Sequence, residues 1–462
     1  MGVRINNNMT CNDRKTSPLT RREFLANSGM GMGLLGLGNL LSPDTQAAGI
    51  GGSGKIKRVL HIFLQGASSH IDTWDPKPAL TKFDGKKING DRLGHASKFE
   101  FTPSGQSGLL MSSAFPKLKQ HADDICVIRS MTTDVPSHDI GVRKFNTGQI
   151  SLPRPSMGSW VSYGLGSAND NLPSFIALSP GSSQRYAESY ASSFIPGLYQ
   201  GTPINTSLRT VDQMIQNIKN KDLSLSEQRA LVDTLQRLNT LHSLENNKDR
   251  ELENRIKSFE TAYNMQIEAF DAFDISKEDK KTVARYGKGA QGRQLLLARR
   301  LLDKGVRFVQ TWHGGWDHHD NLFPSLTTRA RDIDGPLTAL IDDLKAKGMW
   351  DSTLIIMGGE FGRSPHRDGR GPNGNFGRAH QATGFSTVLL SGGIKGGIAY
   401  GATDELGYKA AVDPVPVSEL HDIILRTMGI NPSKFTYRYN GRDFRLVLPE
   451  YLESNHYKKI VA

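Results

Sequence analysis

Cysteine is scarce in this sequence. Only Cys11 and Cys126 occur among 462 residues. Cys11 lies in an N-terminal segment that differs from the rest, so Cys126 is left alone and no intramolecular disulfide is expected, which excludes a disulfide-stapled fold. Cys126 stands in the apolar run DICVI, and this setting favours a buried structural thiol over a nucleophile.

Long hydrophobic runs and clusters of positive charge are also lacking. Hydrophobic residues make up 37% of the chain and charged residues 22%, which indicates a soluble globular protein rather than one with several membrane spans. The formal net charge is +11, but lysine and arginine are scattered and no nucleic-acid-binding module is recognisable, so no nucleic-acid partner is expected. A basic surface would still attract anionic substrates.

The first 48 residues have a pattern of their own. Paired Arg21 and Arg22 in TRREFL precede an uncharged run, NSGMGMGLLGLGNLLS, and then the small residues of DTQAAG. This order resembles a twin-arginine export signal, with an amphipathic or membrane-anchoring helix as the alternative. The run is too short and too rich in glycine to suit a membrane span. We therefore expect export by the twin-arginine translocase to the periplasm or the exterior, with no stable membrane span in the mature chain.

Strand-like and helix-like segments alternate through residues 55–462. Strands are expected at Val59 to Leu64 and in DICVIRSM, LPSFIALSP, VRFVQT, TLIIMG and FSTVLLSGG, with helices in RPSMGSWVSYGLG, Gln294 to Lys304 and VSELHDIILRTMG. The alternation predicts an α/β domain with a mainly parallel sheet. Residues 207–289 are rich in Lys, Glu, Asn, Gln and Leu at helical spacing, which predicts a helical insertion within that domain.

Four polar loops follow predicted strands, around Asp72, His138, Asp317 and Glu360. Ligands of open α/β sheets bind beyond the carboxyl ends of the strands. The four loops therefore predict one composite site.

The loop TWHGGWDHHDN is the richest of these in possible metal ligands. An extended backbone would direct Asp317 and His319 to one side and His318 to the other. A carboxylate oxygen and an imidazole nitrogen together suit zinc or manganese, whereas a hydrogen-bonded polar loop is the alternative.

Two further segments contain residues for the same site. Glu360 follows the predicted strand TLIIMG. A carboxylate there is a metal ligand, a general base or a loop acid whose hydrogen bonds are made within the protein. His380 follows a long loop rich in glycine and arginine, from which it would fold back over the site. Arg363 and Arg378 would then offer bidentate donors to a phosphate, sulfate or carboxylate, although surface solvation is the simpler role for each.

An ordered set of motifs resembles a known family. The motifs are DTWDPKP, the PSH…NTG segment, RPSMGSWVSYGLG, NLPSFIAL, WDHHDN, GEFGRSP, GGIKGGIAYGATDELGY and YNGRDFRL. In this order, and over nearly the whole mature chain, they resemble the bacterial family called domain of unknown function 1501. That family is distantly similar to the alkaline phosphatase and sulfatase superfamily. The resemblance implies an alkaline-phosphatase-like three-layer sandwich that carries one or two divalent metals and hydrolyses phosphate or sulfate esters.

Metal ligands and catalytic residues are implied by the same resemblance. It makes Asp317, His319, Glu360 and His380 the metal ligands, with zinc or manganese as the ion. The first strand of the superfamily normally ends in a metal-binding aspartate, whereas this one ends in Gln65.

The catalytic positions also depart from the superfamily pattern. The resemblance places Asp134 at the nucleophile position, where sulfatases have Cys or Ser. It places His138 at the substrate-contacting position, where sulfatases have Arg. Asp134 would act as a nucleophile, a general base or a further ligand, while His138 and Arg363 would stabilise developing negative charge.

Two functions follow as expectations from these residues. The first is an exported, metal-dependent hydrolase of anionic small-molecule or polysaccharide esters. The second is a protein that keeps the fold, has lost catalysis and serves in binding or assembly, because the hydroxyl nucleophile and the first-strand aspartate are missing.

Overall fold

The computed structural model describes residues 54–462 except 152, 180–183, 216–217, 219–221, 246–249 and 369–374. The predicted export signal, residues 1–48, lies outside the described residues, so export stays a prediction. A search of the described helices for one long and apolar enough to cross a membrane found none.

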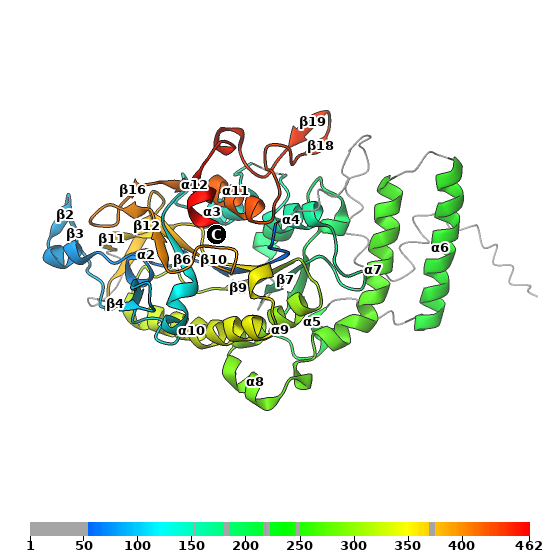
Figure 1. Ribbon diagram of the computed structural model, residues 1–462, viewed down its shortest axis with the longest axis horizontal. Helices are drawn as coiled ribbons and strands as arrows, with labels where there is room; N and C mark the ends of the chain where they lie inside the picture. Colours follow the sequence, from blue (N-terminus) through cyan, green and yellow to red (C-terminus); the bar gives the residue numbers. More distant parts are fainter. Residues whose placement is uncertain are drawn as a thin grey trace, which may run out of the picture.

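A nine-stranded sheet forms the centre of the molecule (Figure 1). In spatial order its strands are β14 (Ile398–Tyr400), β6 (Ile125–Thr132), β13 (Phe385–Leu390), β10 (Thr353–Gly358), β1 (Arg58–Leu64), β9 (Phe308–His313), β7 (Phe175–Ser179) and β8 (Thr202–Asn205), and β17 (Val415–Pro416) pairs with β6. All pairings are parallel except those of β13, which runs antiparallel to β10 and β6. The predicted α/β fold with a mainly parallel sheet is confirmed.

Strand β1 shows why the sheet is covered on both faces. Its sequence, RVLHIFL, is almost continuously apolar, as expected of a strand in the middle of a parallel sheet. Alternate side chains point to opposite faces. Leu60 and Ile62 therefore belong to one buried cluster, while Val59 and Phe63 belong to the other.

Helices supply the other half of each cluster. Figure 1 shows α9 (Ala290–Asp303) and α10 (Leu322–Ala346) on one side of the sheet, and α3 (His138–Thr147), α4 (Met157–Leu165) and α11 (Val417–Thr427) on the other. Leu297 and Leu340 come from the first pair and Phe145 and Leu420 from the second set. Helix, sheet and helix thus form three layers around two hydrophobic cores.

The predicted helical insertion, residues 207–289, contains α5 (Val211–Met214), α6 (Leu225–Glu245), α7 (Arg250–Ala272) and α8 (Lys280–Tyr286). Helices α6 and α7 extend to one side of the sheet (Figure 1). The end of α7 is held by α9, because Arg300 Nε donates to the Ala272 carbonyl at 3.1 Å. The division of the chain into domains stays a prediction.

One predicted loop is partly a hairpin. The glycine- and arginine-rich segment between Glu360 and His380 contains β11 (Gly362–Asp368) and β12 (Gly377–Gln381), which pair antiparallel with Arg363 opposite His380. The expectation of a long loop was wrong for these residues. Its basis was the richness of the segment in glycine and arginine, whereas these strands bury Arg363 and Arg378, which are paired with oxygens of the protein.

Candidate metal centre

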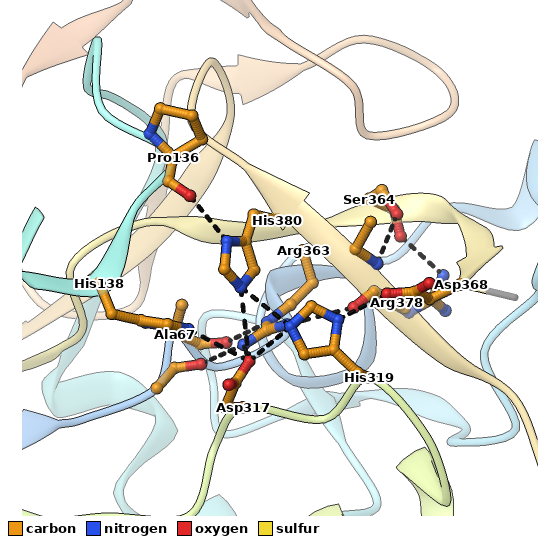
Figure 2. Close-up of polar contacts among 12 residues, drawn as sticks. Ala67, Pro136, His138, Asp317, His319, Arg363, Ser364, Asp368, Arg378 and His380 are labelled. Atoms are coloured by element: carbon orange, nitrogen blue, oxygen red, sulfur yellow. Dashed lines mark hydrogen bonds and ion pairs between the residues drawn. The ribbon is translucent and has the colours of Figure 1, made fainter. Parts of the chain in front are cut away.

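Four polar side chains converge beyond the carboxyl ends of the central strands. His138 begins α3, Asp317 and His319 lie in the loop after β9, and His380 lies on β12. Each offers one possible ligand atom, and these atoms all lie within 4.8 Å of one another. Figure 2 shows the imidazole rings gathered around the Asp317 carboxylate. We call these four side chains the candidate centre.

A single carboxylate oxygen is the common point of the candidate centre. Asp317 Oδ1 lies 3.2 Å from His138 Nε2, 3.0 Å from His319 Nε2 and 3.4 Å from His380 Nε2. The Nε2 atoms of His319 and His380 are 3.0 Å apart. Ligand atoms bonded to zinc at 2.0–2.1 Å and at tetrahedral angles would be about 3.3 Å apart. The four spacings above are close to this value, and all the possible ligand atoms lie within 4.8 Å of one another.

The other ring nitrogen of each imidazole faces an oxygen. His138 Nδ1 lies 2.7 Å from Glu360 Oε1, His319 Nδ1 lies 2.5 Å from Asp368 Oδ2, and His380 Nδ1 lies 2.7 Å from the Pro136 carbonyl. Carboxylate and carbonyl oxygens only accept hydrogen bonds, so Nδ1 is the protonated nitrogen in each neutral ring. All three Nε2 lone pairs then point into the candidate centre.

The pKa values of Asp317 and His138 show that the candidate centre favours a positive charge between its side chains. Burial raises the pKa of Asp317, but His138, His380 and Arg363 outweigh burial and hold that pKa well below its usual range. Burial lowers the pKa of His138, but its hydrogen bonds to Asp317 and Glu360 prevail and raise that pKa to about 9. The cluster therefore favours a proton or a metal cation among its nitrogen and oxygen atoms.

Buried arginines brace the loop that carries Asp317. Arg363 is fully buried, and its guanidinium donates to the Ala67 carbonyl at 2.9 Å, the Arg378 carbonyl at 3.1 Å, the Gly66 carbonyl and Asp317 Oδ1. These contacts fix the carboxylate at the candidate centre, as Figure 2 shows. The role in oxyanion stabilisation that the sequence suggested for Arg363 stays a prediction.

A second buried arginine is bound to a carboxylate after β1. Arg378 Nε donates to Asp72 Oδ2 at 2.7 Å, and both side chains are fully buried. Asp75, the other carboxylate after β1, pairs with Lys77 at 3.0 Å. The acids that follow the first strand thus form ion pairs with basic side chains and are not part of the candidate centre.

Three of the four ligands expected from the sequence come together, and the fourth does not. Asp317, His319 and His380 belong to the candidate centre, whereas Glu360 does not. Glu360 is fully buried, and its Oε1 accepts from His138 Nδ1 and from the Gly66 backbone N–H at 3.0 Å. The fourth position belongs to His138, because α3 begins at the candidate centre and places its first side chain between Glu360 and Asp317.

Asp134 lies outside the candidate centre. Its side chain is 66% exposed and forms an ion pair with Lys144 of α3. Its predicted role as nucleophile, base or ligand stays a prediction. The sequence reasoning also missed Asp368, because the stretch HRDGRG gives no sign that this carboxylate contacts His319.

A model of one protein family matches residues 56–454 and is described as protein of unknown function, DUF1501. The chain belongs to this family. The match spans β1 and the whole candidate centre. A search of the curated proteins found no match.

Solved structures that resemble this member of the DUF1501 family share little sequence with it. A sulfatase, PsFucS1, from Pseudoalteromonas sp. is 12% identical over 81% of this chain and 68% of its own, with a TM-score of 0.33. An alkaline phosphatase from the Antarctic bacterium TAB5 is 11% identical over 82% and 99%, with a TM-score of 0.35. A protein in the alkaline phosphatase superfamily from Vibrio parahaemolyticus is 8% identical over 88% and 75%, with a TM-score of 0.34. Likenesses at this level decide nothing about the chemistry of the chain.

Proposed function

We propose that this protein is a metal-dependent hydrolase of phosphate or sulfate esters, with one divalent ion held by His138, Asp317, His319 and His380. One observation carries the proposal: three imidazole Nε2 atoms converge at 3.0–3.4 Å on one carboxylate oxygen. Nitrogen and carboxylate ligands suit zinc or manganese. A bound ion would polarise the ester oxygen and lower the pKa of a water molecule.

Access and charge at the candidate centre favour an anionic substrate. The Asp317 side chain is 45% exposed and that of His380 is 22% exposed, so a ligand can approach from solvent. His138 is the first residue of α3, which places the positive end of that helix dipole beside the candidate centre. Both features, together with the basic surface, suit a phosphate or sulfate group on a small molecule or a polysaccharide.

The residues around the candidate centre have distinct tasks in this proposal. Arg363 holds Asp317 in place from the buried side. Asp134 lies two residues before Pro136, whose carbonyl contacts His380, and it would serve as a general base on the solvent side. Its ion pair with Lys144 would have to open for this role.

Metal content and turnover test the proposal directly. Elemental analysis should find about one zinc or manganese ion per chain. Turnover of aryl phosphate or aryl sulfate should stop after chelation and return when the metal is restored. Both properties should be lost in Asp317→Ala and His319→Ala and kept in Asp91→Ala, a control whose carboxylate is 93% exposed. A metal-free wild-type protein without turnover would refute the proposal.

Export is a separate part of the proposal. Replacement of Arg21 and Arg22 by lysine should keep the protein in the cytoplasm, because the twin-arginine route depends on the arginine pair. Fractionation of cells that produce the two forms measures this. Equal export of both forms would argue for another route.

A binding or assembly role is the second candidate. It is favoured by the donor groups of Arg363, which are directed to oxygens of the protein, and by Asp134 in a position where a hydroxyl nucleophile would be expected. In this case the protein would bind metal tightly and turn over neither class of ester.

A further inference from the structure

Asp368 contacts the candidate centre from outside. It is the last residue of β11, its side chain is 11% exposed, and its Oδ2 lies 2.5 Å from His319 Nδ1. We infer that Asp368 is a positioning residue that fixes His319 with Nε2 toward the metal and thereby sets the metal affinity. The inference rests on the proposed metal site and adds to it a residue that does not touch the ion.

The two nitrogens of an imidazole make this role necessary. A neutral ring carries its proton on one nitrogen and a lone pair on the other. The Asp368 carboxylate can only accept, so it keeps the proton of His319 on Nδ1 and leaves the Nε2 lone pair beside Asp317 Oδ1 at 3.0 Å. An amide in place of this carboxylate could donate to Nδ1, which would stabilise the opposite tautomer and block metal binding through Nε2.

The three outer partners of the imidazoles differ in what they can reveal. Pro136 uses a backbone carbonyl, which no side-chain substitution removes. Glu360 is fully buried and also accepts from the Gly66 backbone N–H, so its replacement would disturb the loop after β1. Asp368 lies at the end of a hairpin strand and can be replaced by an amide of the same shape. A variant at Asp368 therefore separates an effect on the orientation of His319 from an effect on folding.

The charges around the candidate centre support the same inference. The carboxylates Asp317, Glu360 and Asp368 carry three negative charges, and the buried Arg363 carries one positive charge, while the other buried arginine, Arg378, is neutralised within its own ion pair. Among these groups the negative charges outnumber the positive one, which favours a cation between them. Neutralising Asp368 removes one of these negative charges, and this also weakens the binding of a cation.

Metal affinity in Asp368→Asn tests the inference. Competition with a chromophoric chelator for zinc and for manganese should show affinity about 10- to 100-fold weaker than in wild type, as is typical of lost outer partners. The matched control is Asp91→Asn, an exposed carboxylate paired with Lys87, which should bind like wild type. The melting temperature of metal-free Asp368→Asn should stay within about 2 °C of wild type. Unchanged affinity, or a loss of affinity accompanied by a matching loss of stability in the metal-free protein, would overturn the inference.

A measurement on the wild-type protein makes the test independent of any variant. Nitrogen-15 NMR of the zinc-loaded protein should show His319 protonated at Nδ1 and bound through Nε2, whereas coordination through Nδ1 would refute the inference. Metal binding without ester turnover would refute the hydrolase and leave this inference standing. Wild type that binds neither metal would refute both, and unchanged affinity in Asp368→Asn would refute the positioning role alone.

Discussion

Removal of the metal ion should lower the thermal stability of the wild-type protein by several degrees. An ion that binds only the folded chain, at a free concentration 1,000 times its Kd, adds about 4.1 kcal/mol to the free energy of unfolding. The unfolding entropy is about 2.1 cal/mol/K per residue, or roughly 0.85 kcal/mol/K for the roughly 400 described residues. Chelation should therefore lower the Tm by about 5 °C, because the stabilisation divided by this entropy gives the shift.

Asp317→Asn is the matching perturbation. Asp317 Oδ1 is the atom on which all three imidazoles converge, and its carboxylate is the only negative charge among the four side chains of the candidate centre. The variant should therefore show a metal-dependent shift of less than about 2 °C under the same conditions, as expected if the free metal no longer greatly exceeds Kd.

Differential scanning calorimetry of the chelated and reloaded proteins measures both shifts. Asp91→Asn should behave like wild type, since its carboxylate is 93% exposed. An unchanged wild-type Tm after chelation, or a full shift in Asp317→Asn, would refute a metal ion bound through Asp317.

Three further predictions concern other parts of the structure. Gly377→Ala should weaken metal affinity, because a Cβ there would lie 2.2 Å from the His318 carbonyl oxygen and push β12 away from the loop that carries Asp317 and His319. The chelator competition assay measures this affinity, and an unchanged value would argue against the prediction. Phe63→Ala should lower the free energy of unfolding by about 3–5 kcal/mol, because Phe63 packs against Trp312 and Phe145 in the buried core. Urea titration measures that loss, and the exposed Phe83→Ala should change little. Burial raises the pKa of Cys126 to about 12, so only about one thiol in 10,000 would be ionised at pH 8; in a chain without residues 1–48, a thiol reagent should label Cys126 only after denaturation.

The sheet could be predicted because its strands are apolar. Strands β10, TLIIMG, and β9 were expected from their apolar runs, and the helices α9 and α11 from helix-like segments. The hairpin of β11 and β12 was not predicted, because its strands contain buried arginines. The sequence alone does not distinguish a buried arginine from an exposed one. The antiparallel direction of β13 was also beyond the sequence, because chain direction within a sheet depends on where the connections lie.

Part of the candidate centre was predictable for a different reason. Asp317 and His319 are two residues apart in one loop after a strand, so local geometry alone places them together. His380 was expected from the resemblance to the family. His138 was not among the expected ligands and Glu360 was, since both follow strands of the sheet, and only the direction of α3 decides that His138 reaches the shared oxygen while Glu360 contacts its Nδ1.

Periodicity, apolar runs and side-chain chemistry are local properties, so the order of the amino acids was enough to predict the strands, the α/β class and a set of candidate metal ligands. Which of those residues meet, and which lie behind them, depends on contacts between segments that are far apart in the chain. His138, on the chain nearly 180 residues before Asp317, points its Nε2 at the same carboxylate as His319 and His380. Glu360 lies behind the ring of His138 because α3 brings His138 Nδ1 to it, and Asp368 lies behind the ring of His319 because the hairpin places this carboxylate against His319 Nδ1.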